Sequence, residues 1–179
     1  MQFNAQESSV VNAASKIGLL VLDVDGVLTD GRLYFSAAGE ELKTFHTLDG
    51  QGIKMLQKSG IEVAIITGRS SIAVEKRALD LGIKMLYQGR EDKLVALNEI
   101  LGHQAYTTDQ VAYVGDDLPD LGPIRNVGLS FSVPNGHPEV KNSALAVTTA
   151  NGGFGAVREI SDFILQAQNK YDSFYSQVD

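Results

Sequence analysis

Short apolar runs alternate with amphipathic segments along most of this chain. Almost every position is apolar in residues 17–22, 62–66, 83–87 and 111–114, which predicts buried β-strands, with weaker candidates at 129–133 and 145–148. Apolar residues at helical spacing predict helices over 50–59, 71–81 and 93–101, and over a segment that follows Gly155 and ends near Asn169. The alternation favours an α/β fold of three layers, in which helices cover both faces of a mostly parallel sheet.

Two segments depart from this alternation. Residues 32–45 read as a β-hairpin, because two short arms flank an Ala-Ala-Gly turn. Residues 1–16 are polar and weakly patterned, which predicts a flexible N-terminal arm or a frayed helix. We therefore expect a single domain over residues 17–170, from which the hairpin protrudes, and a C-terminal tail over 171–179.

The composition narrows the class of protein. A chain of 179 residues that is 44% hydrophobic and 21% charged is typical of one globular domain. It has no cysteine, which excludes disulfides, thiolate metal sites and cysteine nucleophiles. No apolar run approaches the ~20 residues of a membrane helix, and residues 1–16 lack the pattern of a signal peptide. We expect a cytoplasmic protein that makes no contact with a membrane.

The charge argues against a nucleic-acid partner. The formal net charge is -7, whereas nucleic-acid-binding domains usually carry a basic face. Most of the basic residues nevertheless lie between positions 43 and 93, and a locally positive region could attract a small anion. On charge alone, solvated helix faces explain this clustering more simply.

Polar residues follow three of the predicted strands. Asp23, Thr67 and Asp116 stand at or just beyond the ends of the apolar runs 17–22, 62–66 and 111–114. Ligands of mostly parallel sheets bind beyond the carboxyl ends of the strands. We therefore expect these three side chains to share one edge of the sheet.

Several aspartates would gather at that edge. Asp23 and Asp25 are two positions apart, so on an extended chain they point to the same side, and the glycine that follows allows a sharp turn. Together with Asp116, Asp117 and Asp120 they place up to five acids near one point. That density of negative charge is unfavourable without a cation, and Mg²⁺ held by carboxylates and a substrate phosphate suits such a site. Separate capping roles for Asp25, Asp117 and Asp120 are the alternative.

Positive groups near the same edge would complement a phosphate. Thr67, Gly68 and Arg69 offer a hydroxyl, an accessible backbone amide and a planar guanidinium. Lys93, at the start of a predicted helix, could bring a mobile ammonium to the same point. Taken alone, a lysine in that position is more often an exposed helix residue.

These motifs together resemble the four-motif series of the haloacid dehalogenase superfamily. DVDGVL after one apolar strand, TGR after the next, an isolated lysine and VAYVGDDLPD occur in the superfamily's order. The resemblance implies a Rossmann-like fold and Mg²⁺-dependent phosphoryl transfer through an aspartyl-phosphate. It implies the following roles: Asp23 as nucleophile and metal ligand, Asp25 as general acid and base with its carbonyl on the metal, Thr67 and Lys93 on the phosphoryl group, Asp116 as metal ligand, and Asp117 and Asp120 as its support.

The segments between these motifs leave no room for a cap domain. The predicted hairpin, helices and strands already occupy residues 24–66 and 68–92, so the chain resembles the capless subclass. A site without a cap accepts large substrates or is closed by another subunit. The hairpin over 32–45 is a candidate for such closure, because two strands alone are marginal and would gain stability by pairing with other hairpins. A simple flap is the alternative.

A narrower resemblance covers residues 16–170. DVDGVLTDG, FHTLDGQGIKML, DLGI, GDDLPD and GGFGAVREISDFILQAQ are similar to the bacterial 3-deoxy-D-manno-octulosonate 8-phosphate phosphatases, which act in synthesis of the lipopolysaccharide inner core. The likeness implies a homotetramer in which hairpins meet centrally and neighbouring subunits complete each site, with residues 152–155 reaching into a neighbour. It also implies substrate contacts by Asp25, His46, Thr47, Leu48, Asp49, Gly50, Lys54, Gly68, Arg69, Arg77 and Lys93.

Other interpretations stay open. The same frame would serve a phosphatase for another keto-sugar acid phosphate, of the nine-carbon sialic-acid type. A signalling receiver domain also places acids, a threonine and a lysine around Mg²⁺, but here the acidic pair Asp116–Asp117 follows Lys93, and a DxD on the first strand would have no use. The stretch FSVPNGH at 131–137 departs from the resemblance and puts only the shape of that loop in doubt.

Overall fold

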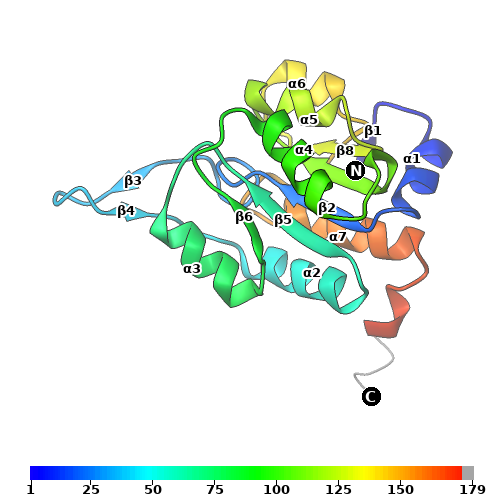
Figure 1. The fold of residues 1–179 in the computed structure, drawn as a ribbon, viewed down its shortest axis with the longest axis horizontal. Coiled ribbons are helices and arrows are strands. Elements are labelled where there is room, and N and C mark those ends of the chain that lie inside the picture. Colours follow the sequence, from blue (N-terminus) through cyan, green and yellow to red (C-terminus); the bar gives the residue numbers. More distant parts are fainter. Residues whose placement is uncertain (175–179) are drawn as a thin grey trace.

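A seven-stranded sheet runs through the centre of the molecule, in the order β1-β9-β8-β7-β2-β5-β6 (Figure 1). The computed structural model describes residues 1–174. β1 is antiparallel to β9, and the other neighbouring strands are parallel, which confirms the expected α/β fold. The strands of this sheet are β1 (Gln2–Phe3), β2 (Leu19–Leu22), β5 (Glu62–Ile66), β6 (Met85–Tyr87), β7 (Val111–Val114), β8 (Leu129–Ser132) and β9 (Ala146–Val147).

Helices cover both faces of this sheet and create two apolar cores. One core contains residues of α1 (Glu7–Ala14), α2 (Thr47–Lys58), α3 (Ile72–Leu81) and α7 (Ala156–Ala167). The other contains residues of α4 (Lys93–His103), α5 (Leu121–Ile124) and α6 (Pro138–Ser143). Within residues 1–174, no helix combines the length and the apolar character needed to cross a membrane.

β2 shows why apolar runs become strands in this fold. All four of its residues are buried. Leu20 and Leu22 belong to the core beneath α2 and α7, whereas Leu19 and Val21 belong to the core beneath α4. Alternate side chains of a strand point to opposite faces, so a strand covered on both faces must be apolar at every position.

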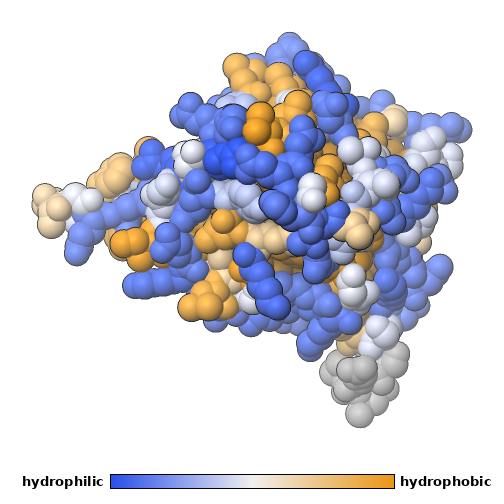
Figure 2. Space-filling view, in the orientation of Figure 1, coloured by the Kyte–Doolittle hydropathy of each residue, from blue (hydrophilic) through white to orange (hydrophobic). Residues whose placement is uncertain are grey.

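The predicted hairpin forms a separate two-stranded sheet that projects from the domain (Figure 1). Its strands are β3 (Tyr34–Phe35) and β4 (Glu41–Leu42), with Tyr34 opposite Leu42. The side chains of Leu33, Phe35 and Leu42 are 48%, 57% and 62% exposed. Figure 2 shows apolar surface along this projection. The hairpin therefore presents apolar side chains that its own chain does not cover.

The N-terminal residues correct part of one prediction. Their polar pattern predicts a flexible arm or a frayed helix over 1–16. The structure has a helix there, α1, but it also has β1, which joins the sheet. Asn4 donates to the carbonyl oxygens of Lys141 and Ala144 at 2.7 and 2.9 Å, and Val10 and Ala14 are buried. These partners lie far along the chain, so a local pattern does not reveal them. Residues 175–179 of the expected C-terminal tail lie outside the described residues.

Candidate active site

Three neighbouring strands deliver polar residues to one edge of the sheet. β7, β2 and β5 lie side by side, and Asp116, Asp23 and Thr67 follow their carboxyl ends. The side chains of Asp23 and Thr67 are buried. After β2 the chain continues on one side of it with β5 and β6, and then returns to its other side with β7. Open α/β sheets bind ligands at the point where the strand order reverses in this way.

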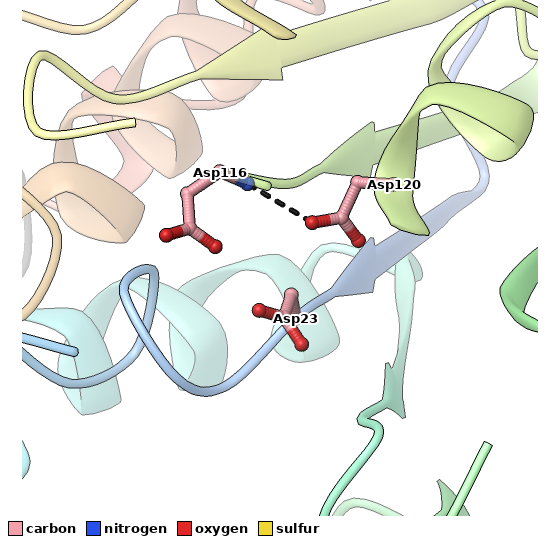
Figure 3. A group of neighbouring side chains, drawn as sticks. All are labelled: Asp23, Asp116 and Asp120. Atoms are coloured by element: carbon pink, nitrogen blue, oxygen red, sulfur yellow. Dashed lines mark hydrogen bonds between the residues drawn. The ribbon is translucent and has the colours of Figure 1, made fainter. Parts of the chain in front are cut away.

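Asp23, Asp116 and Asp120 converge at this edge (Figure 3). One oxygen from each carboxylate lies within 4.8 Å of the other two. Burial raises the pKa of Asp23 to about 6, with Lys93 opposing the shift and Asp120 adding to it. Burial and the charges of Asp23 and Asp120 raise the pKa of Asp116 to about 8. The cluster therefore carries more negative charge than its protein surroundings stabilise, which is typical of a cation site.

The ammonium of Lys93 enters this group of carboxylates. Its Nζ lies 2.9 Å from Asp23 Oδ1 and 2.7 Å from Asp120 Oδ1. Burial lowers the pKa of Lys93, but the two carboxylates raise it by more, so the side chain stays charged. Because the side chain is only 6% exposed, the alternative of an exposed helix lysine is excluded.

Asp120 supports the cluster, because both of its oxygens are already used. Oδ1 accepts hydrogen bonds from Lys93 and from the hydroxyl of Tyr113, each at 2.7 Å. Oδ2 accepts from the backbone N–H groups of Asp116 and Asp117, each at 3.1 Å. Asp120 thus orients Lys93 and the loop after β7. The side chain of Asp117 is exposed, and only the backbone N–H of this residue takes part in these hydrogen bonds.

Asp116 has an oxygen that the protein leaves unsatisfied. Its Oδ1 is buried and has no hydrogen-bond partner, which is costly for a carboxylate. Gly26 has φ +104, and a Cβ at that position would lie 2.0 Å from Asp116 Oδ2. The loop that carries Asp25 therefore reaches Asp116 only because residue 26 is glycine. Two acids from adjacent strands and an orphaned oxygen fit a hard divalent cation such as Mg²⁺.

A series of ion pairs links the hairpin to the loops that carry Asp25 and Arg69. The ammonium of Lys43 contacts Asp25 Oδ1 and lies 3.6 Å from Glu41 Oε1. The same Glu41 oxygen lies 3.2 Å from Arg69 Nη2. Lys43 is a residue that sequence reasoning missed, because in the sequence it is one of several polar positions in the predicted hairpin. Only the folded hairpin brings it to Asp25.

Some predicted substrate contacts have accessible side chains and others are used within the fold. Thr47, Leu48 and Arg69 are exposed, and Gly68 is half-buried. Asp49 is 1% exposed, and its Oδ1 accepts from the backbone N–H of Arg158 at 2.8 Å. That contact caps the first turn of α7, so the structure places the Asp49 side chain at a helix end instead of at the mouth.

Four further predicted contacts lie on α2, at its start or against it. His46 Nδ1 accepts from the backbone N–H of Leu48 at 3.2 Å and caps the start of this helix. Arg77 pairs with Asp80 at 2.9 Å and stacks over Phe45 at 5.8 Å, so it stabilises the entry to α2. Gly50 is buried against Arg77, since a Cβ there would lie 2.3 Å from Nη2. Lys54 is exposed in a groove between α2 and α3, and the structure does not bring it to the carboxylates.

The glycine segment 152–155 packs against the Asp25 loop of its own chain. Gly153 donates to the carbonyl of Val27 at 2.9 Å. The contact with a neighbouring subunit that the resemblance implies stays a prediction. Asn135 holds the two loops together, donating to the Gly26 carbonyl at 3.1 Å and accepting from the Gly152 N–H at 2.8 Å. A Cβ at Gly152 would lie 1.7 Å from the Gly26 oxygen. This close packing fixes the segment to the Asp25 loop, and the sequence pattern gave no sign of the role of Asn135.

Comparison with known proteins agrees with this geometry. The haloacid dehalogenase-like hydrolase family matches residues 85–160. The 3-deoxy-D-manno-octulosonate 8-phosphate phosphatase of Yersinia pestis is 50% identical over 91% of this chain and 87% of its own. The crystal structure of a probable YrbI-family phosphatase from Pseudomonas syringae has a TM-score of 0.94 and 52% identity, covering 96% of this chain and 97% of that chain.

A further similar structure was solved with ligands. The 3-deoxy-D-manno-octulosonate 8-phosphate phosphatase of Moraxella catarrhalis was solved with a magnesium ion, a phosphate ion and 3-deoxy-D-manno-octulosonate. It is 42% identical to this chain with a TM-score of 0.95, over 97% of this chain and 100% of that chain. The likeness therefore extends over the whole domain and not over the motifs alone. The chain belongs to the haloacid dehalogenase-like hydrolases, in the family of the 3-deoxy-D-manno-octulosonate 8-phosphate phosphatases.

Proposed function

We propose that this chain is a Mg²⁺-dependent phosphomonoesterase that hydrolyses 3-deoxy-D-manno-octulosonate 8-phosphate to the free sugar acid and phosphate, a step towards the lipopolysaccharide inner core. The observation that carries the proposal is the convergence of Asp23, Asp116 and Lys93 at the carboxyl edge of the sheet. Curated relatives that are 50% and 49% identical are named for this activity. The Moraxella catarrhalis structure with magnesium, phosphate and the sugar acid supports the cofactor and the substrate class.

Asp23 is the nucleophile in this proposal. Lys93 holds one of its oxygens at 2.9 Å and so fixes the direction in which the carboxylate faces the phosphorus. Asp23 and Asp116 would hold Mg²⁺, which when bound supplies positive charge to the phosphoryl oxygens. Thr67, buried at the end of β5, and Lys93 would hold the phosphoryl group in line for attack.

Asp25 is the proposed acid and base. Attack by Asp23 breaks the phosphate ester bond, and the leaving sugar oxygen takes a proton from Asp25. Asp25 then removes a proton from the water that hydrolyses the aspartyl-phosphate. The covalent intermediate divides one difficult displacement into two easier ones.

A phosphate-release assay tests this function. The panel contains the octulosonate ester, a nine-carbon keto-acid phosphate, an aldose phosphate and acetyl phosphate, each with Mg²⁺ and with a chelator. We expect turnover of the octulosonate ester that requires Mg²⁺. Turnover of the nine-carbon ester or the aldose phosphate, with none of the octulosonate ester, would overturn the substrate. A long-lived phosphoprotein formed from acetyl phosphate without ester turnover would indicate a receiver domain, an alternative that membership of a phosphatase family already argues against.

We also propose that the chain assembles as a homotetramer through its hairpins. Leu33, Phe35 and Leu42 are exposed on this projection, and contiguous exposed apolar surface usually marks an interaction site. A two-stranded hairpin is marginal alone, so burial against the hairpins of other subunits would stabilise it. A neighbouring subunit would then stand close to a site that has no cap domain.

The proposed function also fits one domain over 17–170 and the cytoplasm. The proposed catalytic groups span Asp23 to Asp120 within that sheet, and residues 1–16 add an edge strand and a helix to it. A phosphorylated sugar acid carries several charges and does not cross a lipid bilayer unaided. The enzyme would therefore act in the compartment where this substrate is made.

A further inference from the structure

Lys43 is a buried cation at the base of the hairpin. It follows β4 directly, and its side chain is only 2% exposed. A charged group in such surroundings needs partners of opposite charge. In the part of the chain that the structure describes, its ion-pair partners are Asp25 and Glu41. One of them is the proposed acid and base of the reaction, which makes Lys43 more than a structural ion pair.

We propose that Lys43 is a positioning residue that orients Asp25 for proton transfer to the leaving group. The inference rests on the proposed function. Lys43 donates to Oδ1 of Asp25, which leaves Oδ2 to carry the proton. As the ester P–O bond breaks, the Oδ2–H bond also breaks, the proton passes to the departing sugar oxygen, and the electron pair of that O–H bond stays on Asp25.

Orientation explains why this contact would favour the reaction. Lys43 holds one oxygen of Asp25 from the hairpin side, so that the other oxygen can face the leaving group. A proton donor that is already held in reach of the leaving oxygen loses little freedom at the moment of transfer, and such positioning lowers the barrier to the chemical step.

The surroundings of Lys43 keep it in place. Glu41 lies 3.6 Å from its Nζ, and Glu41 in turn lies 3.2 Å from Arg69 in the loop after β5. Asp25 itself belongs to a loop, and its side chain is 20% exposed. A contact from the hairpin thus restrains a carboxylate that the loop presents to solvent. The hairpin would set the position of the acid as well as contribute to assembly.

A comparison of two leaving groups tests the proposal. The leaving group of the sugar ester is a basic alkoxide, which needs a proton to depart. The leaving group of p-nitrophenyl phosphate is a weakly basic phenolate, which departs with little help from an acid. The ratio kcat/KM covers the steps up to departure of the leaving group, so hydrolysis of the aspartyl-phosphate does not affect it. We expect Lys43→Met to lower kcat/KM about 100-fold for the sugar ester and less than about threefold for p-nitrophenyl phosphate, because a general acid contributes roughly 10²–10⁴-fold.

The deciding quantity is the quotient of kcat/KM for the sugar ester over kcat/KM for p-nitrophenyl phosphate. This quotient does not depend on the fraction of folded enzyme, so partial unfolding of Lys43→Met cannot imitate the result. Lys43→Arg keeps a positive donor and should keep most of the wild-type quotient. Lys84→Met, at an exposed lysine before β6, is the matched control and should leave both values unchanged. An unchanged or raised quotient in Lys43→Met, with an active wild type, overturns this inference alone. A wild type that does not hydrolyse the sugar ester overturns the proposed function.

Discussion

Asp116 and Asp120 are the same residue type and differ in what their oxygens contact. Asp120 uses both oxygens on Lys93, Tyr113 and two backbone N–H groups. Asp116 keeps a buried oxygen without any partner. A satisfied carboxylate supports its neighbours, whereas an unsatisfied one is available to a cation. The contacts therefore separate the support from the ligand, a distinction that the letters GDDLPD do not contain.

Replacement of Asp23 by asparagine tests the nucleophile. Asn retains an oxygen that can accept from Lys93, and it removes a buried carboxylate whose pKa burial raises to about 6, so Asp23→Asn should still fold. An amide does not attack phosphorus, so essentially all turnover should be lost. Phosphate release and thermal unfolding, measured on the same preparation, check both expectations. Phosphatase activity that persists in this variant would remove Asp23 from the nucleophile's role.

Gly26 offers a second test at this scale, with Gly60 as its matched control. Both have positive φ, +104 and +81, so alanine strains either backbone by roughly 1–2 kcal/mol. A Cβ at Gly26 would lie 2.0 Å from Asp116 Oδ2, whereas a Cβ at Gly60 meets nothing within 4 Å. We expect Gly26→Ala to lose on the order of 100-fold in kcat/KM, because small displacements of reacting groups cost that much.

Gly60→Ala should keep its kcat/KM and lose only stability. Denaturant unfolding of both variants separates the two effects. Equal losses of activity in Gly26→Ala and Gly60→Ala would assign the effect to backbone strain and not to the contact with Asp116.

Among the elements, the buried strands could be predicted closely from the sequence. β5 and β7 coincide with the apolar runs 62–66 and 111–114, because helices on both faces require an apolar residue at every position. β1 and the docking of the N-terminal segment could not be predicted, since β1 is held by pairing with β9 and Asn4 bonds to residues near position 144. Contacts that distant leave no periodic trace in a polar segment.

Some residues of the site could likewise be predicted from the sequence, and others could not. Asp23, Thr67 and Asp116 could be predicted because strand ends define their place, and Lys93 because it begins a helix next to them. Lys43 and Asn135 act across the fold, so their spacing in the sequence carries no signal. Asp49 has a role that the sequence did not predict, because one of its oxygens caps α7 once the chain is folded.

Glu159 in the first turn of α7 predicts a pH dependence of stability. Its carboxylate accepts from the backbone N–H groups of Thr149 and Ala150 at 3.0 and 2.9 Å. Burial alone would raise the pKa of Glu159, but these hydrogen bonds lower it below the usual 4.5. A lowered pKa in the folded state contributes stability above the unfolded pKa, and that contribution is lost as the pH falls through the folded pKa.

We therefore expect Glu159→Gln to lower the free energy of unfolding at pH 7 by about 1 kcal/mol. The difference from wild type should shrink as the pH falls from the usual glutamate pKa of 4.5 through the lowered pKa of the folded state, since the wild-type carboxyl then becomes protonated too. Denaturant unfolding across the pH range measures it. Glu91→Gln, at an exposed glutamate outside any helix or strand, is the control and should show no such dependence. A constant difference between Glu159→Gln and wild type at every pH would contradict the assignment.

At the scale of the whole molecule, the hairpin links two properties. It carries the exposed apolar residues proposed for assembly, and its base carries Lys43, which contacts Asp25. Deletion of residues 32–45 would remove both, so a monomer with poor activity would not show which loss mattered. Substitutions near the tip that leave Lys43 in place separate assembly from the position of the acid.

The double variant Phe35→Ser with Leu42→Ser makes that separation. Both side chains are more than half exposed, so a single subunit should fold as before, while subunit contacts would lose the apolar area that stabilises them. We expect a smaller assembly by sedimentation velocity and a lower kcat/KM, because no neighbouring subunit would close the site. Leu79→Ser, on the exposed face of α3 at 82%, should leave both unchanged. A fully active monomer would show that each subunit's site is complete by itself, and an unchanged assembly would place the interface elsewhere.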